Sequence, residues 1–451
     1  ATEKAKDLVR MACARANHLE PLPTITIPVT QCGLVIGGGI SGMNAALSLA
    51  SQGYKVYLVE RQGELGGNAR HIHRAIDGRN TKEYLDSLIE RVEKHPDITV
   101  HKNSNIESVT GYIGNFRTRV KKQDAEAKRQ EVFEIQHGVI IVAAGAQEYK
   151  PAEYLYGKDQ RIITQRELEG LIFDHQSMRL SDRKTIAMIQ CVGSRDTDRP
   201  YCSRICCSQA IKNALLVKEK NPDTEVIVFY KDIRTYGLNE IYYQKARDAG
   251  VVFIRYDDTF KPEVSIHNGR LVVKAKEPIL NEEIAFSVDL VVLSAGIVPD
   301  ESNREIAQLL KVPLNEDRFF LEAHMKLRPV DFATDGIFIC GMAHSPKTID
   351  ESIAQAQATA SRAGIVLSND TIEVLPAVAE VDTEKCIGCG ICETLCAYQA
   401  HELKKTDKGY RSEVISAYCK GCGSCAASCP QQAITMKHFT NEQIMAMVEA
   451  I

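Results

Sequence analysis

Residues 34–42 read LVIGGGISG and decide the first fold assignment of this 451-residue chain. A buried apolar run leads into the pattern G-x-G-x-x-G, and a helix pattern follows at once. Gly37 allows the tight turn, Gly39 lets the backbone approach a pyrophosphate, and Gly42 lets the helix pack on the strand. Glu60 ends the next strand, where an acid accepts ribose hydroxyls. The stretch predicts a dinucleotide bound at a helix N-terminus.

Strand and helix patterns alternate around this motif. Apolar runs at 32–36 and 55–59 indicate buried strands, with a helix pattern at 40–52 between them. The alternation returns from 184 to 300, and a long helix pattern covers 348–367. Strands that alternate with helices predict parallel sheets. We therefore expect an α/β chain with two Rossmann-like domains.

Three further motifs indicate which dinucleotide is bound. Residues 61–68 read RQGELGGN and resemble the segment of two-dinucleotide-domain flavoproteins that brings a second glycine pair to the pyrophosphate. Residues 139–145 and 334–341 resemble the second and third motifs of that class. Met342 stands where most members carry aspartate, so we expect the ribityl contact from the backbone or His344. The resemblance implies FAD, held by Gly37, Gly39, Gly42, Glu60, Arg61, Gly66, Gly67, Asn68, Ala144, Gly145, Gly341 and Met342.

The second alternating unit lacks the residues that cradle a pyrophosphate. In the thioredoxin-reductase-like branch of these flavoproteins, an NAD(P)H domain is inserted at this place in the chain. Its first strand normally leads into another glycine fingerprint, but residues 191–195 read CVGSR here. The second strand ends at Tyr230 and Lys231 instead of at an acid. We predict a nucleotide-like fold that does not bind NAD(P)H.

Four cysteines stand where those glycines would be. Their spacing is C-x10-C-x3-C-C, at the mouth of a strand-to-helix turn, and they are Cys191, Cys202, Cys206 and Cys207. Four thiolates suit a [4Fe–4S] cluster or a tetrahedral zinc ion. A redox disulfide and plain core packing are further alternatives, although adjacent cysteines rarely face one core together. We expect a cluster at this position.

The C-terminal stretch has the spacing of a bacterial two-cluster ferredoxin. Two runs each read C-x2-C-x2-C-x3-C, followed by Ala397 in the first and Pro430 in the second. The fourth cysteine of each such run binds the other run's cluster. We expect an α+β ferredoxin domain with two [4Fe–4S] clusters. The predicted ligand sets are Cys386, Cys389, Cys392 and Cys429 for the first cluster, and Cys419, Cys422, Cys425 and Cys396 for the second.

These features divide the chain into predicted domains. The parts are 1–30 as helix and linker, 31–150 with 300–370 as the FAD-binding domain, 151–299 as the degenerate NAD(P)-like domain with its cysteine site, 369–379 as a linker, and 380–451 as the ferredoxin. Of the 15 cysteines, only Cys13, Cys32 and Cys340 lie outside the clusters, and we expect them to be buried thiols.

Composition excludes several functions. The net charge of −4 gives no basic surface for nucleic acid, so we expect no nucleic-acid partner. The longest apolar runs are far shorter than the roughly 18 residues that span a bilayer. No secretory signal is visible, so a disulfide framework is disfavoured. We expect a cytoplasmic protein without a membrane span.

The whole constellation resembles the A subunit of heterodisulfide reductase. The most specific stretches are 191–195 and 201–207, the latter reading YCSRICC, and the likeness extends over nearly the whole chain. Full-length members usually carry an additional N-terminal domain and a further ferredoxin module near the second glycine pair. Neither is visible here, and the chain begins with Ala1, so we expect that the N-terminal domain is absent or supplied separately.

This resemblance implies an FAD and iron–sulfur oxidoreductase of the CoB–CoM heterodisulfide type, which functions in methanogenesis. It implies flavin-based electron bifurcation. The implied partners are the B and C subunits, a hydrogenase or formate dehydrogenase donor, ferredoxin, and a second copy in a homodimer. The alternatives are a related subunit without bifurcation, such as one of a quinone-interacting complex, and an NAD(P)H-dependent flavoprotein reductase.

One catalytic residue follows from the same resemblance. The family places a lysine five residues after the double cysteine, close to flavin N5, and Lys212 matches that position. A cation there would stabilise a reduced, anionic flavin. The alternative is an ordinary solvated lysine on a helix surface.

Overall fold

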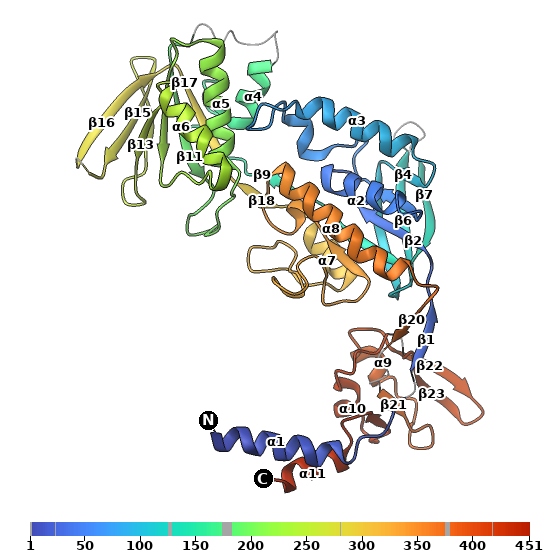
Figure 1. The fold of residues 1–451 in the computed structure, drawn as a ribbon. Helices are drawn as coiled ribbons and strands as arrows, with labels where there is room; N and C mark the ends of the chain where they lie inside the picture. The colour runs from blue at the N-terminus through green and yellow to red at the C-terminus, as the bar shows by residue number, and fades with distance from the viewer. Residues whose placement is uncertain are drawn as a thin grey trace. The chain divides into compact units, whose positions relative to one another are not determined.

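The computed structural model describes residues 2–22, 24–124, 129–173, 183–279, 281–374, 379–416 and 418–451. The chain forms two compact units (Figure 1). Unit 1 combines Ala1–Thr30, Gly111–Asn115 and Asn369–Ile451, and unit 2 combines Gln31–Thr110 and Phe116–Ser368. The predicted N-terminal segment and ferredoxin therefore share one unit, while both Rossmann-like domains lie in the other.

The first sheet of unit 2 is parallel and carries the glycine fingerprint. Its strand order is β19-β8-β2-β3-β4, with bounds Ile337–Ile339, Val139–Val142, Cys32–Ile36, Lys55–Val59 and Ile98–His101. Helices α2 (Ile40–Ala50), α3 (Thr81–Lys94) and α8 (Ile349–Leu367) lie along one side, and α2 packs on α8 (Figure 1). All five residues of β2 are buried, as expected for a strand covered on both faces.

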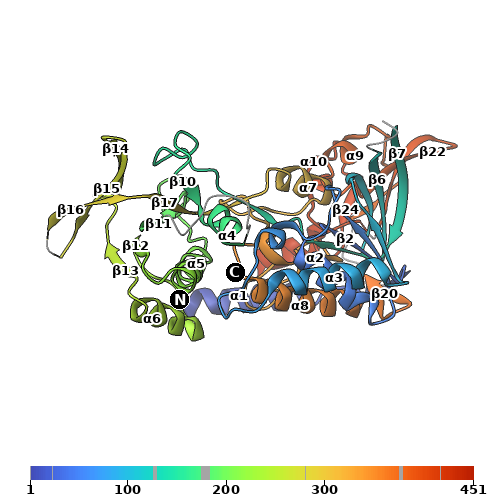
Figure 2. The same cartoon turned by 90° about the horizontal axis from the view of Figure 1, so that it is seen from above.

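The other face of this sheet is covered by a second, antiparallel sheet (Figure 2). Its strands are β5 (Ser104–Tyr112), β6 (Asn115–Asp124) and β7 (Arg129–His137). Leu34 and Ile36 of β2 join one apolar core with Phe116, Val120 and Ile135 of the covering strands. The carboxyl ends of β2, β3 and β8 lead into the predicted dinucleotide site, where the first residues of β5 also lie.

The second parallel sheet confirms the Rossmann-like expectation for the middle of the chain. Its order is β10-β17-β11-β12-β13, with bounds Ile162–Thr164, Leu290–Ala295, Thr185–Val192, Glu225–Tyr230 and Val252–Arg255. Helices α4 (Gln165–Phe173), α5 (Cys206–Lys220) and α6 (Glu240–Asp248) cover one face. The antiparallel strands β14 (Glu263–His267), β15 (Arg270–Glu277) and β16 (Glu282–Val288) cover the other (Figure 2).

Two short antiparallel strands carry the chain between the sheets. Strand β9 (Ala146–Glu148) leads out of the first sheet, and β18 (Ile297–Pro299) returns beside it before α7 (Asn303–Leu310). The nucleotide-like domain is thus inserted within the dinucleotide-binding domain, with crossings close to residues 150 and 300.

Unit 1 contains the cysteine-dense C-terminus. The strand pairs are β21 (Ala379–Val381) with β24 (Ile434–Met436), and β22 (His401–Thr406) with β23 (Gly409–Val414). Two short helices, α9 (Ile391–Leu395) and α10 (Ser424–Ser428), follow the two cysteine loops. This is the α+β arrangement expected for the ferredoxin domain.

The ends of the chain contribute to the same unit. Helix α1 (Thr2–Ala16) packs against α11 (Asn441–Glu449), and β1 (Ile25–Pro28) pairs with β20 (Thr371–Val374). Part of the predicted 369–379 linker is therefore a strand, because β1 satisfies its backbone hydrogen bonds, while residues 375–378 lie outside the described ranges.

The three isolated cysteines differ from one another. Cys32 and Cys340 are buried, as predicted, but the expectation of burial is wrong for Cys13. Cys13 is exposed because α1 has no buried residue along its length. Among the helices that the structure describes, none is both long enough and apolar enough to cross a membrane.

Candidate cofactor sites

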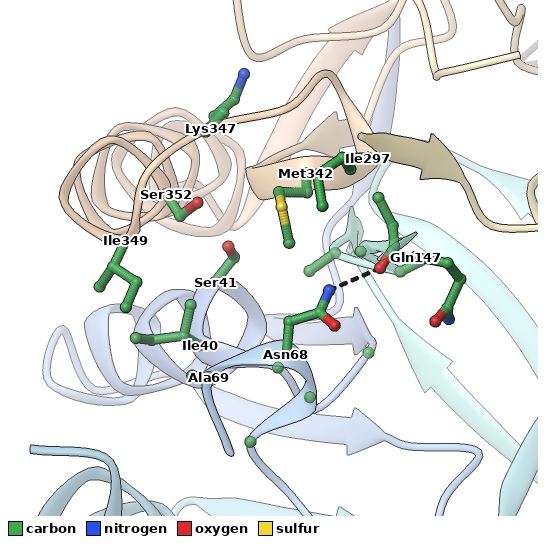
Figure 3. Close-up of a pocket in the computed structure, with 18 of the residues that line it drawn as sticks. Ile40, Ser41, Asn68, Ala69, Gln147, Ile297, Met342, Lys347, Ile349 and Ser352 are labelled. Atoms are coloured by element: carbon green, nitrogen blue, oxygen red, sulfur yellow. Dashed lines mark hydrogen bonds between the residues drawn. The ribbon is translucent and has the colours of Figure 1, made fainter. Parts of the chain in front are cut away.

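A cavity of about 570 Å³ opens at the carboxyl ends of the first parallel sheet (Figure 3). It extends from the glycine fingerprint to helix α5 and the start of α8. Most of the predicted flavin-site residues line it: Gly37, Gly39, Glu60, Arg61, Gly66, Gly67, Asn68, Ala144, Gly145, Met342 and Lys212. Gly42 and Gly341 do not line the cavity.

The fingerprint glycines are required for three different steric reasons. Gly37 has φ +109°, and an added Cβ would lie 2.3 Å from the carbonyl oxygen of Ala143. A Cβ on Gly42 would lie 1.9 Å from the carbonyl oxygen of Gly37, so this glycine serves helix packing. Nothing lies within 4 Å of a Cβ built on Gly39, which leaves the open space that a close pyrophosphate needs.

The second glycine pair, Gly66 and Gly67, contacts the glycines of the fingerprint. The Gly66 N–H donates to the carbonyl oxygen of Gly38 at 2.8 Å, and a Cβ on Gly67 would lie 3.3 Å from the Cα of Gly39. Asn68 Nδ2 donates to the carbonyl oxygen of Ala146 at 2.7 Å (Figure 3). The two glycine segments therefore form one continuous backbone cradle at the N-terminus of α2.

Glu60 is held in place by backbone amides. Its Oε2 accepts from the Gly38 N–H at 2.6 Å, and its Oε1 accepts from the Gln62 N–H at 2.8 Å. A carboxylate has about four lone-pair positions, so both oxygens keep capacity for the hydroxyls of a ribose. The site therefore fits the adenosine end of FAD.

Arg61 lines the cavity but is already paired. Its guanidinium makes a two-pronged contact with Asp300, at 2.8 Å from Nη1 and 2.5 Å from Nη2. Although burial opposes the effect, hydrogen bonds from Arg61, Gln147 and Ser302 hold the pKa of Asp300 well below its ordinary value. The pair ties the end of β3 to the segment after β18.

Met342 takes the cavity position that aspartate occupies in most of the class. Its side chain points into the cavity opposite Asn68 (Figure 3). His344 does not line the cavity, because its Nε2 lies 2.8 Å from Glu322 Oε2. The Gly341 N–H donates to Gln355 Oε1 at 2.9 Å. His344 is thus engaged within the protein, the backbone contact stays a prediction, and the Met342 side chain lines the cavity.

Lys212 is buried, so the solvated-lysine alternative is wrong. It is 7% exposed, and its Nζ donates to Glu169 Oε2 at 2.5 Å and to the carbonyl oxygen of Arg74 at 3.1 Å. Burial lowers the pKa of Lys212, although the Glu169 carboxylate opposes this. The lysine reaches the cavity wall as one half of a buried ion pair.

Two carboxylates have no sequence signal, one that contacts Lys212 behind this wall and one that lines the cavity. Glu169, on α4, is fully buried, and it also accepts from the His73 N–H at 2.7 Å. Glu148, on β9, lines the cavity, and burial raises its pKa to about 7 although Arg166 opposes the rise. Glutamates in a helix or a short strand are ordinarily solvated. That Glu169 and Glu148 are removed from solvent becomes visible only when β9, α4 and α5 pack around the cavity.

The four middle cysteines come together at the end of β11 and the start of α5. Cys206 and Cys207 are both buried in the first turn of α5. Burial raises the pKa of the Cys206 thiol, and repulsion from Cys207, Cys191 and Cys202 raises it further. Thiolates that repel each other in this way favour binding of a cationic metal centre, because the metal compensates the thiolate charge.

The loop around these cysteines carries backbone strain. Cys191, Arg195 and Arg204 all have positive φ, at 62°, 58° and 61°. Residues other than glycine adopt this conformation at a cost and do so most often at functional sites. A Cβ on Gly193 would lie 2.1 Å from the ring of Tyr149, so that ring fills the space in front of the loop.

The structure gathers the first predicted ferredoxin set across the two runs. A small cavity is lined by Cys386, Cys389 and Cys392 together with Cys429 from the second run. A Cβ on Gly388 would lie 2.3 Å from the carbonyl oxygen of Tyr410, which is why the loop needs glycine there. These four sulfurs surround one space, as the crossed ligation pattern requires.

The second set is also gathered. Burial raises the pKa of the Cys425 thiol to about 11, and repulsion from Cys419, Cys396 and Cys422 contributes. Backbone amides point at these sulfurs, since Ala379 N–H donates to Cys419 Sγ at 3.4 Å. Ala400 N–H donates likewise to Cys396 Sγ at 3.3 Å. Such amides tune the potential of a bound cluster.

No group of three or more His, Cys, Asp and Glu side chains within the described ranges is arranged to hold a metal ion. A single zinc ion draws its sulfur ligands to about 2.3 Å from one centre. A cube of iron and sulfide instead takes four cysteines on its corners. Cys386, Cys389, Cys392 and Cys429 line one small cavity together, and four cysteines are the donor set that the cluster takes.

Comparisons with known proteins agree with these sites. A family model described as FAD dependent oxidoreductase matches residues 34–180, and one described as 4Fe-4S dicluster domain matches residues 379–436. Among solved structures, the thioredoxin reductase of T. acidophilum shares the fold, with TM-score 0.50 and 15% identity over 75% of this chain and 98% of that chain. The Lactococcus lactis thioredoxin reductase is similar, with TM-score 0.50 and 18% identity over 74% of this chain and 98% of that chain.

Relatives extend the agreement to the whole sequence. One iron–sulfur A subunit of the CoB–CoM heterodisulfide reductase of Methanopyrus kandleri is 37% identical over 90% of this chain and 75% of its own length. The A subunit of the H(2):CoB-CoM heterodisulfide,ferredoxin reductase of Methanothermobacter marburgensis is 36% identical over 100% of this chain and 80% of its own length. That alignment is longer than this chain, because the relative carries segments without a counterpart here.

The fold and sites define an oxidoreductase that combines a thioredoxin-reductase-like FAD protein with a dicluster ferredoxin domain. Its cofactors are FAD and [4Fe–4S] clusters. The chain belongs to the family of heterodisulfide reductase A subunits.

Proposed function

We propose that this chain moves electrons between FAD and three [4Fe–4S] clusters within a heterodisulfide-reductase-type complex. The observation that carries the proposal is that helix α5 serves two sites. Its first turn bears Cys206 and Cys207, and Ser208, Gln209 and Lys212 line the flavin cavity. Five helical residues span about 7.5 Å along the axis. A cluster on these cysteines therefore lies within a short electron-transfer distance of the cavity.

The proposed reaction is flavin-based electron bifurcation. FAD supplies the two-electron chemistry at which the electron pair is divided. Two electrons come from a hydrogenase or formate dehydrogenase partner, one leaves through the B and C subunits to a heterodisulfide, and one leaves to ferredoxin. Two rounds supply the two electrons that cleave one disulfide. The relatives' names support this choice, since the M. marburgensis protein is named for hydrogen, heterodisulfide and ferredoxin. We further propose that two copies form a homodimer.

The chain's own residues prepare the flavin cavity for this role. The glycine cradle and the N-terminus of α2 bind the pyrophosphate, and Glu60 binds the ribose. The residues of β9 and α5 enclose the other end. Lys212 holds a positive charge at that wall, with Glu169 fixing its position.

An NAD(P)H-dependent reductase is the second candidate. It needs space for a pyrophosphate at the end of β11, where the Tyr149 ring contacts Gly193 instead. A cation–π contact holds that ring, with the Arg199 guanidinium 4.3 Å from its centre. These contacts favour the electron-transfer function over direct NAD(P)H oxidation.

Cofactor counting under anaerobic conditions tests the proposed function. We expect about one FAD and about twelve irons per chain, from three four-iron clusters. Iron assay, flavin absorbance and EPR during stepwise reduction measure these directly. About eight irons would remove the cluster at Cys191–Cys207, and rapid reduction of the flavin by NADH would favour the second candidate.

Replacing Lys212 with methionine tests its proposed flavin role. Loss of the cation should make the flavin harder to reduce, by about 30 mV, a tenfold change for a two-electron couple. The potential is measured by spectroelectrochemistry, with the exposed Lys94→Met as the control. An unchanged potential would leave Lys212 with a purely structural function.

A further inference from the structure

Arg204 lies in the loop between two of the middle cysteines and contacts one of them through its backbone. Its N–H donates to Cys202 Sγ at 3.3 Å, and its φ of +61° is strained for a residue other than glycine. Helix α5 begins two residues further on, with the adjacent cysteines Cys206 and Cys207. The backbone of Arg204 is therefore fixed to the cysteine loop.

The side chain of Arg204 contacts a different part of unit 2. Its Nη2 donates to Glu351 Oε1 at 2.5 Å, and its Nη1 donates to the carbonyl oxygen of Pro346 at 3.5 Å. Glu351 lies in the first turn of α8, and Pro346 lies in the segment that leads into this helix. One guanidinium therefore holds the chain at two points, just before and just after α8 begins.

This start of α8 forms part of the flavin cavity wall (Figure 3). The lining residues on it are Lys347, Thr348, Ile349, Asp350 and Ser352. Glu351 fixes the same segment through a capping box, because its Oε2 accepts from the Thr348 N–H at 3.0 Å and its own N–H donates to Thr348 Oγ1 at 3.3 Å. Arg204 therefore connects the cysteine loop to the wall of the flavin cavity through Glu351.

We propose that Arg204 couples the two cofactor sites, so that a [4Fe–4S] cluster on the four middle cysteines and FAD in the cavity each strengthen binding of the other. Arg204 and Glu351 are positioning residues, since neither lines the cavity or belongs to the proposed cluster ligands. The inference rests on the proposed function, because it needs a cluster at these cysteines.

The coupling has a physical source in the ordering of a long side chain. Holding an arginine side chain in one arrangement costs conformational entropy. A cluster fixes the loop at the backbone end of Arg204, and FAD fixes the wall at its guanidinium end. The first cofactor to bind orders part of this connection, so the second binds at a smaller cost. Thermodynamic linkage makes the effect equal in both directions.

The ion pair itself is only partly buried. The Arg204 and Glu351 side chains are 37% and 36% exposed, and pairs at this level of exposure contribute little to stability. We therefore expect variants of either residue to fold, and the effect of losing the pair to lie in cofactor binding.

A double-variant cycle on the full chain tests the coupling. Cys207→Ser removes the middle cluster and keeps the two ferredoxin clusters, so it should weaken FAD binding about tenfold, an ordinary size for coupling between two sites. In an Arg204→Met background, the same change should weaken FAD binding by less than about twofold. FAD affinity is measured anaerobically from the fluorescence of released flavin.

The cycle separates coupling from a merely structural effect. A direct effect of serine on the neighbouring cavity appears in both backgrounds and cancels. An arginine that only stabilises the wall would lower FAD affinity by the same factor with and without the cluster. No weakening by Cys207→Ser in the wild-type background, or equal weakening in both backgrounds, would overturn the inference.

Arg79 provides a matched control at the same helix turn. Its Nη2 donates to Asp350 Oδ1 at 3.5 Å, next to Glu351, but it lies just before α3 and not in the cysteine loop. Arg79→Met should keep the full response of FAD binding to Cys207→Ser. Loss of that response would mean that removing any arginine contact at α8 abolishes it, which contradicts a specific connection through Arg204.

A second variant covers the case in which Arg204→Met does not fold. Glu351→Gln keeps the capping box with Thr348 and removes the charge that holds the guanidinium, so it should also reduce the response to Cys207→Ser. Iron content separates the two levels of failure. About eight irons per wild-type chain contradicts the cluster and the proposed function, whereas about twelve irons with an unchanged response in both variants contradicts only the coupling.

Discussion

Replacing Glu169 with alanine should lower the free energy of unfolding by about 3–5 kcal/mol, because it leaves the Lys212 ammonium buried without its partner. The Lys212 and Glu169 side chains are 8% and 0% exposed. Glu169 also accepts from the backbone N–H groups of His73 and Arg74, so the change frees three donors at once. Denaturant unfolding of the flavin-free chain measures the loss.

The size of this loss should depend on pH in a defined direction. Burial already lowers the pKa of Lys212, and removing Glu169 removes the charge that opposes this lowering. Between the folded and unfolded pKa values, the unfolded chain binds more protons, so stability rises with pH across that window. The loss in unfolding free energy of Glu169→Ala relative to the wild-type chain should therefore become smaller from about pH 7 to about pH 10.

A double variant and a surface pair complete this test. Lys212→Met in the Glu169→Ala background removes the unpaired charge and should recover part of the loss. The exposed pair Glu90 and Lys94, on α3, is the matched control, and Glu90→Ala should change stability little. Additive losses from Glu169→Ala and Lys212→Met would show that the two residues do not act as a pair.

Replacing Cys429 with serine should remove the cluster of the other cysteine run. Cys429 lines one cavity with Cys386, Cys389 and Cys392, although more than thirty residues separate it from them. We expect the loss of about four of about twelve irons, with the EPR signal of the remaining ferredoxin cluster retained. Iron assay and EPR of the anaerobically purified variants give the answer.

The double variant Cys386→Ser with Cys429→Ser makes this result decisive. If both cysteines bind one cluster, the double variant loses the same four irons, approximately, as each single variant. If each run binds its own cluster, the double variant loses about eight irons. Cys13→Ser is the control, because Cys13 is exposed on α1 and outside every cysteine group, and it should keep the full iron content.

Local patterns predict the parts of this protein that depend on a few neighbouring residues. The glycine fingerprint is readable from the sequence because steric limits act within the turn itself, as the close approach at Gly37 shows. The crossed ferredoxin ligation is predictable because cluster chemistry demands one ligand spacing. The fingerprint and the spacing within each cysteine run are local, so they can be recognised without the fold.

Predictions that depend on distant partners are less successful. Burial is expected for Cys13, but its helix has no buried face. A flavin contact is expected from the backbone or His344, but the His344 ring contacts Glu322. A linker is expected at residues 371–374, but they pair with the strand at 25–28. For His344 and for residues 371–374, the deciding neighbour lies elsewhere in the chain and carries no motif.

The sequence by itself determined the cofactors, the alternation of strands and helices, and the three groups of cysteines, because turn sterics and metal chemistry constrain residues close in the chain. Only the tertiary structure decided that Lys212 is buried against Glu169 and that Glu148 lines the cavity. Burial and partnership depend on which segments meet when the sheets pack. The sequence around each of these residues does not indicate its burial or its partner, because both arise only when distant segments pack together.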